Sequence, residues 1–185
     1  MENDKQINKK YVRPLPKFLS KEEVQLIRDQ TKNMHDRMLV DLLYYFGLRV
    51  SELCALQREW FDFKEEMLEL PREAVKRKRS RRIPISKIIK SDLKKYLDSL
   101  LEGEQIVKVT RQTVYNRLKQ WAKEAGLTKN VHPHMLRHTY ATAIYNAKRD
   151  LNLVKELLGH ENISTTAIYA RCDDKYMKEG IEGVL

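Results

Sequence analysis

The sequence predicts one α+β domain that is mainly α-helical, with a small antiparallel β-sheet inserted after the first helices. Three observations predict this class. Apolar residues recur at helical spacing along most of the chain, while only residues 60–86 show short alternating runs with aromatic residues. The 185 residues suit one ordinary domain. A chain of this length buries a substantial core without disulfides or metal ions.

The first predicted helices lie before the sheet. Ser20 and Glu23 have the spacing of a capping box, which predicts a helix that runs from there to about residue 32. Apolar residues within 34–46 predict a second helix, and Gly47 is suited to end it as a C-cap. A short third helix is predicted from about residue 50 to 57.

The sheet and the remaining helices follow in order. Residues 60–86 predict two or three antiparallel strands, after which the helical period returns. Glycines mark the expected breaks between these helices. The predicted helices are 86–101, 111–125, 134–147, 151–158, 163–170 and 174–182, with breaks at Gly103, Gly126 and Gly159.

The composition narrows the class of partner and the compartment. A formal net charge of +10 favours a polyanionic partner, most often nucleic acid, over a basic protein that has none. Cys54 and Cys172 are too far apart for a CxxC pair, which indicates reduced thiols and excludes a zinc ribbon. No apolar run approaches the roughly 18 residues of a membrane span, and residues 1–10 lack the apolar region of a secretory signal. We therefore expect a cytoplasmic protein, associated with the nucleoid.

A basic run within the predicted sheet is the first candidate for function. In "KRKRSRR", residues 76–82, six of seven side chains are cationic. Such a run is often a solvated hairpin tip, but the flanking strand signals favour a hairpin that lies along a DNA backbone. The residues expected to contact DNA are Arg77, Lys78, Arg79, Arg81 and Arg82.

The stretch "HPHMLRHTYATAIY" is the second candidate. His134 and Arg137 are three residues apart and therefore share a helix face. Arginine suits bidentate phosphate recognition, whereas a lone histidine is more often structural, as His138 is expected to be. The helix also has apolar positions that predict a buried face: Leu136, Tyr140, Ala143 and Ile144.

Two further stretches place polar groups where apolar residues dominate. In "LLGHENISTTAIYAR", Gly159 ends a helix, His160 follows it, and Tyr169 stands nine residues later. Taken alone, Tyr169 would be an ordinary half-buried tyrosine. In "LLYYFGLRVSELCAL", Arg49 and Glu52 interrupt an apolar run. Because burying an unpaired charge is costly, Glu52 is expected to hold Arg49 by a charge-assisted hydrogen bond.

Together these motifs, "GLRVSEL", "HPHMLRHTYAT" and "LLGHENISTTAIYAR", resemble the tyrosine recombinase family, also called phage-integrase-type recombinases, and within it the Xer-like branch. The resemblance covers about residues 18–175. It implies a catalytic domain at 17–173, preceded by a flexible arm, 1–16, and followed by a C-terminal tail helix, 174–185, that docks in trans. The helical core-binding domain that usually precedes the catalytic domain is expected to be absent, as in a fragment or a minimal recombinase.

The resemblance also implies a mechanism. Arg49 and Arg137 would clamp the scissile phosphate of DNA, and His160 would donate another hydrogen bond to it. Tyr169 would attack phosphorus to form a covalent 3′-phosphotyrosine, with His134 as the candidate base. Lys76, or alternatively Lys78, would protonate the leaving 5′-oxygen. Rejoining would need no ATP, metal or cofactor.

The implied function is therefore site-specific breaking and rejoining of double-stranded DNA, with a homotetrameric synapse. A different class of function, a non-catalytic DNA-binding regulatory protein with the same fold, stays open as the alternative. A relaxing enzyme that resembles type IB topoisomerases is a third possibility, disfavoured because the sequence has no large clamp domain.

Overall fold

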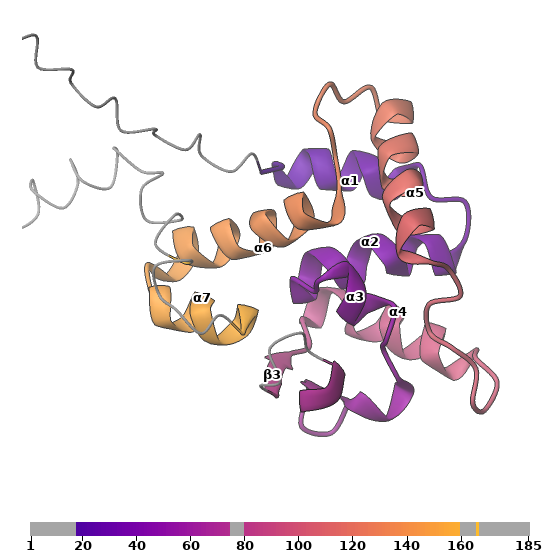
Figure 1. The fold of residues 1–185 in the computed structure, drawn as a ribbon, viewed down its shortest axis with the longest axis vertical. Coiled ribbons are helices and arrows are strands. Elements are labelled where there is room, and N and C mark those ends of the chain that lie inside the picture. The colour runs from indigo at the N-terminus through magenta and orange to yellow at the C-terminus, as the bar shows by residue number, and fades with distance from the viewer. Residues whose placement is uncertain (1–17, 75–79, 160–165, 167–185) are drawn as a thin grey trace, which may run out of the picture.

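The structure, a computed structural model, describes residues 18–74, 80–159 and 166. This part of the chain is mostly helical with a three-stranded antiparallel sheet, which confirms the predicted α+β class (Figure 1). The elements are α1 Lys21–Asp29, α2 Met34–Phe46, α3 Val50–Leu53, β1 Phe61–Asp62, β2 Met67–Leu70, β3 Arg81–Pro84, α4 Lys87–Asp98, α5 Arg111–Glu124, α6 Pro133–Lys148 and α7 Leu151–Leu158, with 3₁₀ turns at Arg58–Trp60 and Arg72–Ala74.

Helix α2 is the central element of the fold. It packs against α1, α3, α4 and α6, and most of its residues are buried, as its nearly continuous apolar sequence requires (Figure 1). It ends at Gly47, which has a left-handed φ of 57°. A Cβ added at Gly47 would lie 2.3 Å from a ring carbon of Tyr140 on α6. Glycine therefore both makes the turn and allows α6 to approach it.

The sheet has the strand order β1-β2-β3, and its period of two decides which side chains enter the core. In the β2–β3 pair, Leu68 lies opposite Ile83 and Leu70 lies opposite Arg81. Arg81 and Ile83 are buried, whereas Arg82 between them is exposed. The two neighbouring arginines therefore point to opposite faces of the sheet.

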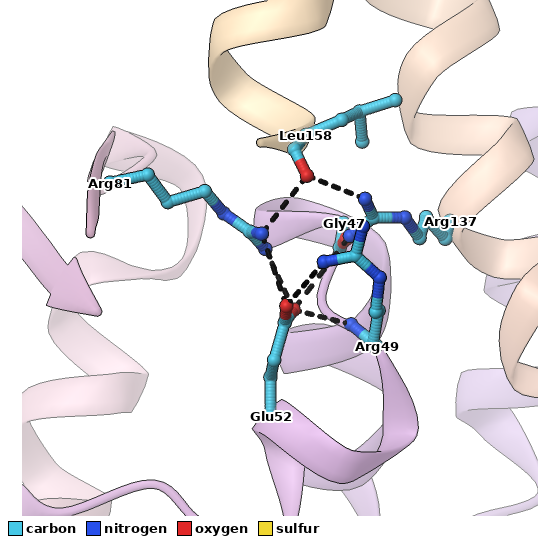
Figure 2. A network of polar contacts seen from close by, with 6 residues as sticks. All are labelled: Gly47, Arg49, Glu52, Arg81, Arg137 and Leu158. Carbon is cyan, nitrogen blue, oxygen red and sulfur yellow. Dashed lines mark hydrogen bonds and ion pairs between the residues drawn. The ribbon is translucent and has the colours of Figure 1, made fainter. Parts of the chain in front are cut away.

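Helices α6 and α7 bring the second half of the chain back to α2 and the sheet. Helix α6 begins with a cap from the His132 side chain and with Pro133 at its first turn. Helix α7 packs against α6 and β3, and it ends at Gly159, which has a left-handed φ of 63°. The end of α2, the strand β3, the first turns of α6 and the end of α7 thus meet in one region (Figures 1 and 2).

The described helices occur in the predicted order. The differences concern where some helices end and which face of α6 is buried. The first helix ends at Asp29 rather than near residue 32, and α3 is a single turn, Val50–Leu53, rather than 50–57. Ala143 was predicted to be buried but is exposed, because it lines an open groove beside α7. The predicted helices at 163–170 and 174–182 lie outside the described residues, apart from Thr166.

Candidate functional site

A single buried carboxylate, that of Glu52, lies at the centre of three guanidinium groups (Figure 2). Its oxygens lie 2.7 Å from Arg49 Nη1, 2.7 Å from Arg81 Nη2 and 3.7 Å from Arg137 Nη1. The Glu52 side chain has no exposed surface. These four residues come from α3 and its N-cap, from β3 and from α6, so the cluster joins three separate stretches of the sequence.

Arg49 is held by the local geometry between α2 and α3. The left-handed turn at Gly47 ends α2, and Arg49 follows as the N-cap residue of α3. Its backbone N–H and its Nη1 each donate to Glu52, at 2.8 Å and 2.7 Å. Glu52 thus neutralises part of the charge and also caps the first turn of α3.

Arg137 links three elements through its guanidinium. Its Nη1 donates to the carbonyl of Gly47 at 2.6 Å, and its Nη2 donates to the carbonyl of Leu158, also at 2.6 Å. The first carbonyl belongs to the end of α2 and the second to the end of α7, two carbonyls that helix termini leave without intrahelical partners. Arg137 is therefore buried and oriented by backbone atoms.

Arg81 requires a revision of the sequence prediction. Its position in a cationic run predicted an arginine that contacts DNA, but its side chain is only 4% exposed and faces Glu52. It donates to both Glu52 oxygens, at 3.1 Å and 2.7 Å, and to the Leu158 carbonyl at 2.9 Å. The alternation in "RRIPI" is the signal that predicts this position, since Arg81 shares a sheet face with Ile83 and Ile85.

The cluster carries excess positive charge. Three guanidiniums surround one carboxylate, so these four side chains together carry two net positive charges. Burial raises the pKa of Glu52, but the charges of Arg81 and Arg137, with hydrogen bonds from the Arg81 side chain and the Arg49 backbone, outweigh this and lower the pKa below its ordinary value. Glu52 is therefore ionised at neutral pH. The Arg49 side chain, at 17% exposed, is the least enclosed guanidinium of the three.

The histidines of α6 lie beside this cluster. His134 is exposed to solvent, and partial burial of its ring together with the charge of Arg137 lowers its pKa, which favours a neutral imidazole at neutral pH. Burial, and then the charges of His134 and Arg137, lower the pKa of His138 to about 4. A neutral imidazole with access to solvent suits a general base. The roles of His134 as a base and of His138 as a structural residue stay predictions.

Several predicted residues lie outside the described part of the chain: Lys76, Arg77, Lys78, Arg79, His160 and Tyr169. Two of them are close in sequence to residues of the cluster or to its contacts. Lys76 lies five residues before Arg81, and His160 lies two residues after Leu158, whose carbonyl Arg81 and Arg137 share. Arg82 is exposed on the outer face of the sheet and pairs with Glu69 at 2.8 Å.

Two properties of the described residues concern metal ions and membranes. Within residues 18–74, 80–159 and 166, no group of three or more His, Cys, Asp or Glu side chains could hold a metal ion. None of the helices in that same part of the chain is long and apolar enough to cross a membrane.

Comparison with known protein families gives a match over most of the chain. The model of the phage integrase family matches residues 17–176. The tyrosine recombinase XerA of Pyrococcus horikoshii is 36% identical over 191 residues, which cover 98% of this chain and 66% of the relative. The tyrosine recombinase XerC of Xylella fastidiosa is 34% identical over 182 residues, covering 92% of this chain and 61% of that relative. This chain thus spans less than two thirds of the length of these relatives.

Solved structures show the same arrangement of elements. The crystal structure of a XerA recombinase superposes with a TM-score of 0.75 at 26% identity, covering 92% of this chain and 66% of the other. The site-specific recombinase XerH, in a pre-cleavage complex with its difH substrate, superposes with a TM-score of 0.74 at 25% identity, covering 91% of this chain and 55% of the other.

Proposed function

This chain belongs to the phage integrase family, and from that premise we propose that it is a site-specific DNA recombinase. It breaks and rejoins duplex DNA through a covalent 3′-phosphotyrosine, without a metal ion, a cofactor or ATP. The identities with named tyrosine recombinases support this activity, and the complexes of XerH with difH support DNA as the partner. The protein would act in the cytoplasm, associated with the nucleoid.

One observation carries the proposal: three guanidiniums are fixed around a single buried carboxylate. Phosphoryl transfer depends mainly on positioning and on stabilising the charge that grows on the non-bridging oxygens. The guanidiniums of Arg49 and Arg137, held by backbone carbonyls and by Glu52, are preorganised for that task. Arg49 and Arg137 supply the clamp, and Glu52 keeps Arg49 in place.

The remaining steps use the residues that follow these elements in sequence. Tyr169 attacks phosphorus as its proton passes to His134, and the 5′-oxygen leaves with a proton from Lys76, or from Lys78 if the hairpin is shifted by two residues. His160 donates a further hydrogen bond to the phosphate. In the second step a 5′-hydroxyl attacks the phosphotyrosine, which restores the DNA backbone and releases Tyr169.

Binding to the duplex is assigned to the basic hairpin. Arg77, Lys78, Arg79 and Arg82 neutralise phosphates along the backbone, which contributes affinity with little sequence information. Arg82 is the described member of this group, and its exposed side chain on the outer face of the sheet suits the role. Arg81 is not assigned to these DNA-contacting residues, because its guanidinium is buried.

Assembly into a tetramer is assigned to the tail, residues 174–185. Its apolar residues, Tyr176, Met177, Ile181 and Val184, recur roughly at helical spacing. In the described part of the chain, a groove between α6, α7 and the start of α4 is lined mostly by apolar side chains, which could bury the apolar face of such a tail. The groove is lined mainly by Tyr44, Tyr45, Pro84, Ile88, Tyr140, Ala143, Ile144, Ala147, Leu153 and Leu157. We place the tail of a neighbouring subunit there, since a head-to-tail contact of this kind closes into a ring.

A nicked duplex that traps the cleaved intermediate tests the proposed function. Recombinase chemistry predicts a protein–DNA adduct on a denaturing gel, because the short fragment beyond the nick is lost and religation fails. A non-catalytic DNA-binding protein of the same fold would shift the duplex on a native gel and leave no adduct on the denaturing one.

A further inference from the structure

Arg81 approaches the cluster from the side opposite to Arg49 and Arg137 (Figure 2). It reaches two groups at once: both oxygens of Glu52, at 3.1 Å and 2.7 Å, and the carbonyl of Leu158, at 2.9 Å. It therefore connects β3, which follows the basic hairpin, to α3 and to the end of α7. No other residue of the cluster belongs to the sheet.

Stability alone is a poor reason for this arrangement. Replacing a buried ion pair by apolar side chains of similar volume is often neutral or stabilising. Moreover, among the described residues nothing accepts a hydrogen bond from the buried Nε of Arg81, and a buried donor without an acceptor is destabilising. The fold also makes room for Arg81, since a Cβ at Gly159 would lie 3.0 Å from its Nη1 and 3.1 Å from its Cδ.

The charges of the cluster suggest what Arg81 does. Glu52 has two oxygens, and Arg81 donates to both of them. Without Arg81, the buried carboxylate would be left with Arg49 and Arg137 alone. It would then compete with a phosphate for the two guanidiniums that are proposed to bind it. The Leu158 carbonyl would also lose one of its two donors, next to the segment that leads to His160.

We propose that Arg81 is a positioning residue: it occupies Glu52 and the end of α7, so that Arg49 and Arg137 stay oriented toward the scissile phosphate. This inference rests on the proposed function. It assigns Arg81 to the interior of the active site, and it leaves phosphate contacts along the duplex to the other hairpin cations.

Single-turnover cleavage of the nicked duplex at saturating protein provides the first measurement. Arg58→Gln is the matched control, since Arg58 also pairs with a carboxylate, that of Asp98 at 2.9 Å, but its side chain is 52% exposed and lies outside the cluster. Arg81→Gln should lower the rate constant of adduct formation by up to about 100-fold, the scale expected for misplaced reacting groups. A merely structural role would reduce the amount of active protein, and so the final yield, without changing this rate constant. Arg81→Lys should recover part of the rate, because it restores a charge beside Glu52.

The second measurement does not depend on cleavage. The Nε–H signals of Arg49 and Arg137 in ¹H–¹⁵N NMR spectra, assigned from Arg49→Lys and Arg137→Lys, report on the orientation of these side chains. Both signals should shift in Arg81→Gln and stay in place in Arg58→Gln. If Arg81→Gln does not fold, Arg81→Lys takes its place, because lysine keeps a positive charge beside Glu52 but lacks the guanidinium that donates to both of its oxygens.

The two measurements separate the possible failures. Signals of Arg49 and Arg137 that stay in place without the Arg81 guanidinium would overturn the positioning role, and so would a wild-type rate constant. If the wild-type protein forms no adduct at all, the proposed function fails, and the NMR comparison still decides the role of Arg81.

Discussion

Arg137 Nη1 donates a hydrogen bond to the carbonyl of Gly47 at 2.6 Å, which ties α6 to the turn that presents Arg49. The two residues are 90 positions apart in the sequence. Because glycine at this turn both adopts a left-handed φ and admits the ring of Tyr140, the contact depends on the backbone as much as on the guanidinium. The two proposed clamp arginines are therefore positioned by one local structure.

The first prediction follows from this shared structure. Arg137→Lys should lower the single-turnover cleavage rate by orders of magnitude, because an ammonium lacks the planar fork that spans the Gly47 and Leu158 carbonyls and the phosphate. Arg49→Lys should show a similar loss, and DNA affinity should change little in either variant. A wild-type rate for Arg137→Lys would contradict the bidentate clamp.

The second prediction separates chemistry from binding in the basic hairpin. Lys76→Ala should mainly slow cleavage, and a 5′-bridging phosphorothiolate substrate should restore its rate, because that leaving group needs no proton. Replacing Arg77, Arg79 and Arg82 with glutamine should instead weaken binding to every duplex and flatten its salt dependence. Restoration of Lys78→Ala rather than Lys76→Ala would show that the lysine lies two residues further along.

The third prediction concerns pH and His138. Burial and the nearby charges lower its pKa to about 4 in the folded protein, whereas an unfolded histidine titrates near about 6.5. Between these values the unfolded chain binds a proton that the folded protein does not. The free energy of unfolding should therefore fall as the pH is lowered through this window. His138→Asn should flatten that slope in denaturant titrations, apart from the share due to His35, His132 and His134, whose pKa values are also lowered. An unchanged slope would contradict this account of His138.

The fourth prediction concerns the tail and the apolar groove. Deleting residues 174–185 should leave a folded protein that still cleaves a single site but assembles abnormally on DNA, as measured by light scattering and crosslinking. Ile88→Asp, at a groove position that is 73% exposed, should have the same effect. Leu101→Asp is the control, since Leu101 is 78% exposed but lies outside the groove. Wild-type assembly of the truncated protein would exclude docking in trans, as would its unfolding.

The order of the elements could be predicted because local signals agree with the fold. The capping box of Ser20 and Glu23 starts α1, and Gly47 and Gly159 end α2 and α7 with the left-handed φ that glycine permits. The change from helical to alternating periodicity marks the sheet. Helix ends were less predictable: α3 ends at Leu53 after one turn, although apolar residues continue to Leu56.

The site was only partly predictable for a different reason. The pairing of Arg49 with Glu52 is local and follows from their spacing along one turn. The contacts of Arg137 with Gly47 and Leu158 join residues from distant parts of the chain, so no local pattern predicts them. Arg81 was assigned to the DNA surface because the density of cations in its run outweighed the alternation that places it beside Ile83 and Ile85.

Covalent capture of DNA tests the central claim most directly. The wild-type protein, incubated in EDTA with a nicked duplex that carries its recombination site, should form an adduct that survives denaturing electrophoresis. Tyr169→Phe should abolish the adduct while binding on a native gel persists, because only the hydroxyl is lost. An adduct formed by Tyr169→Phe would remove Tyr169 as the nucleophile. A wild-type protein that binds this site but never becomes linked to it would contradict the recombinase assignment.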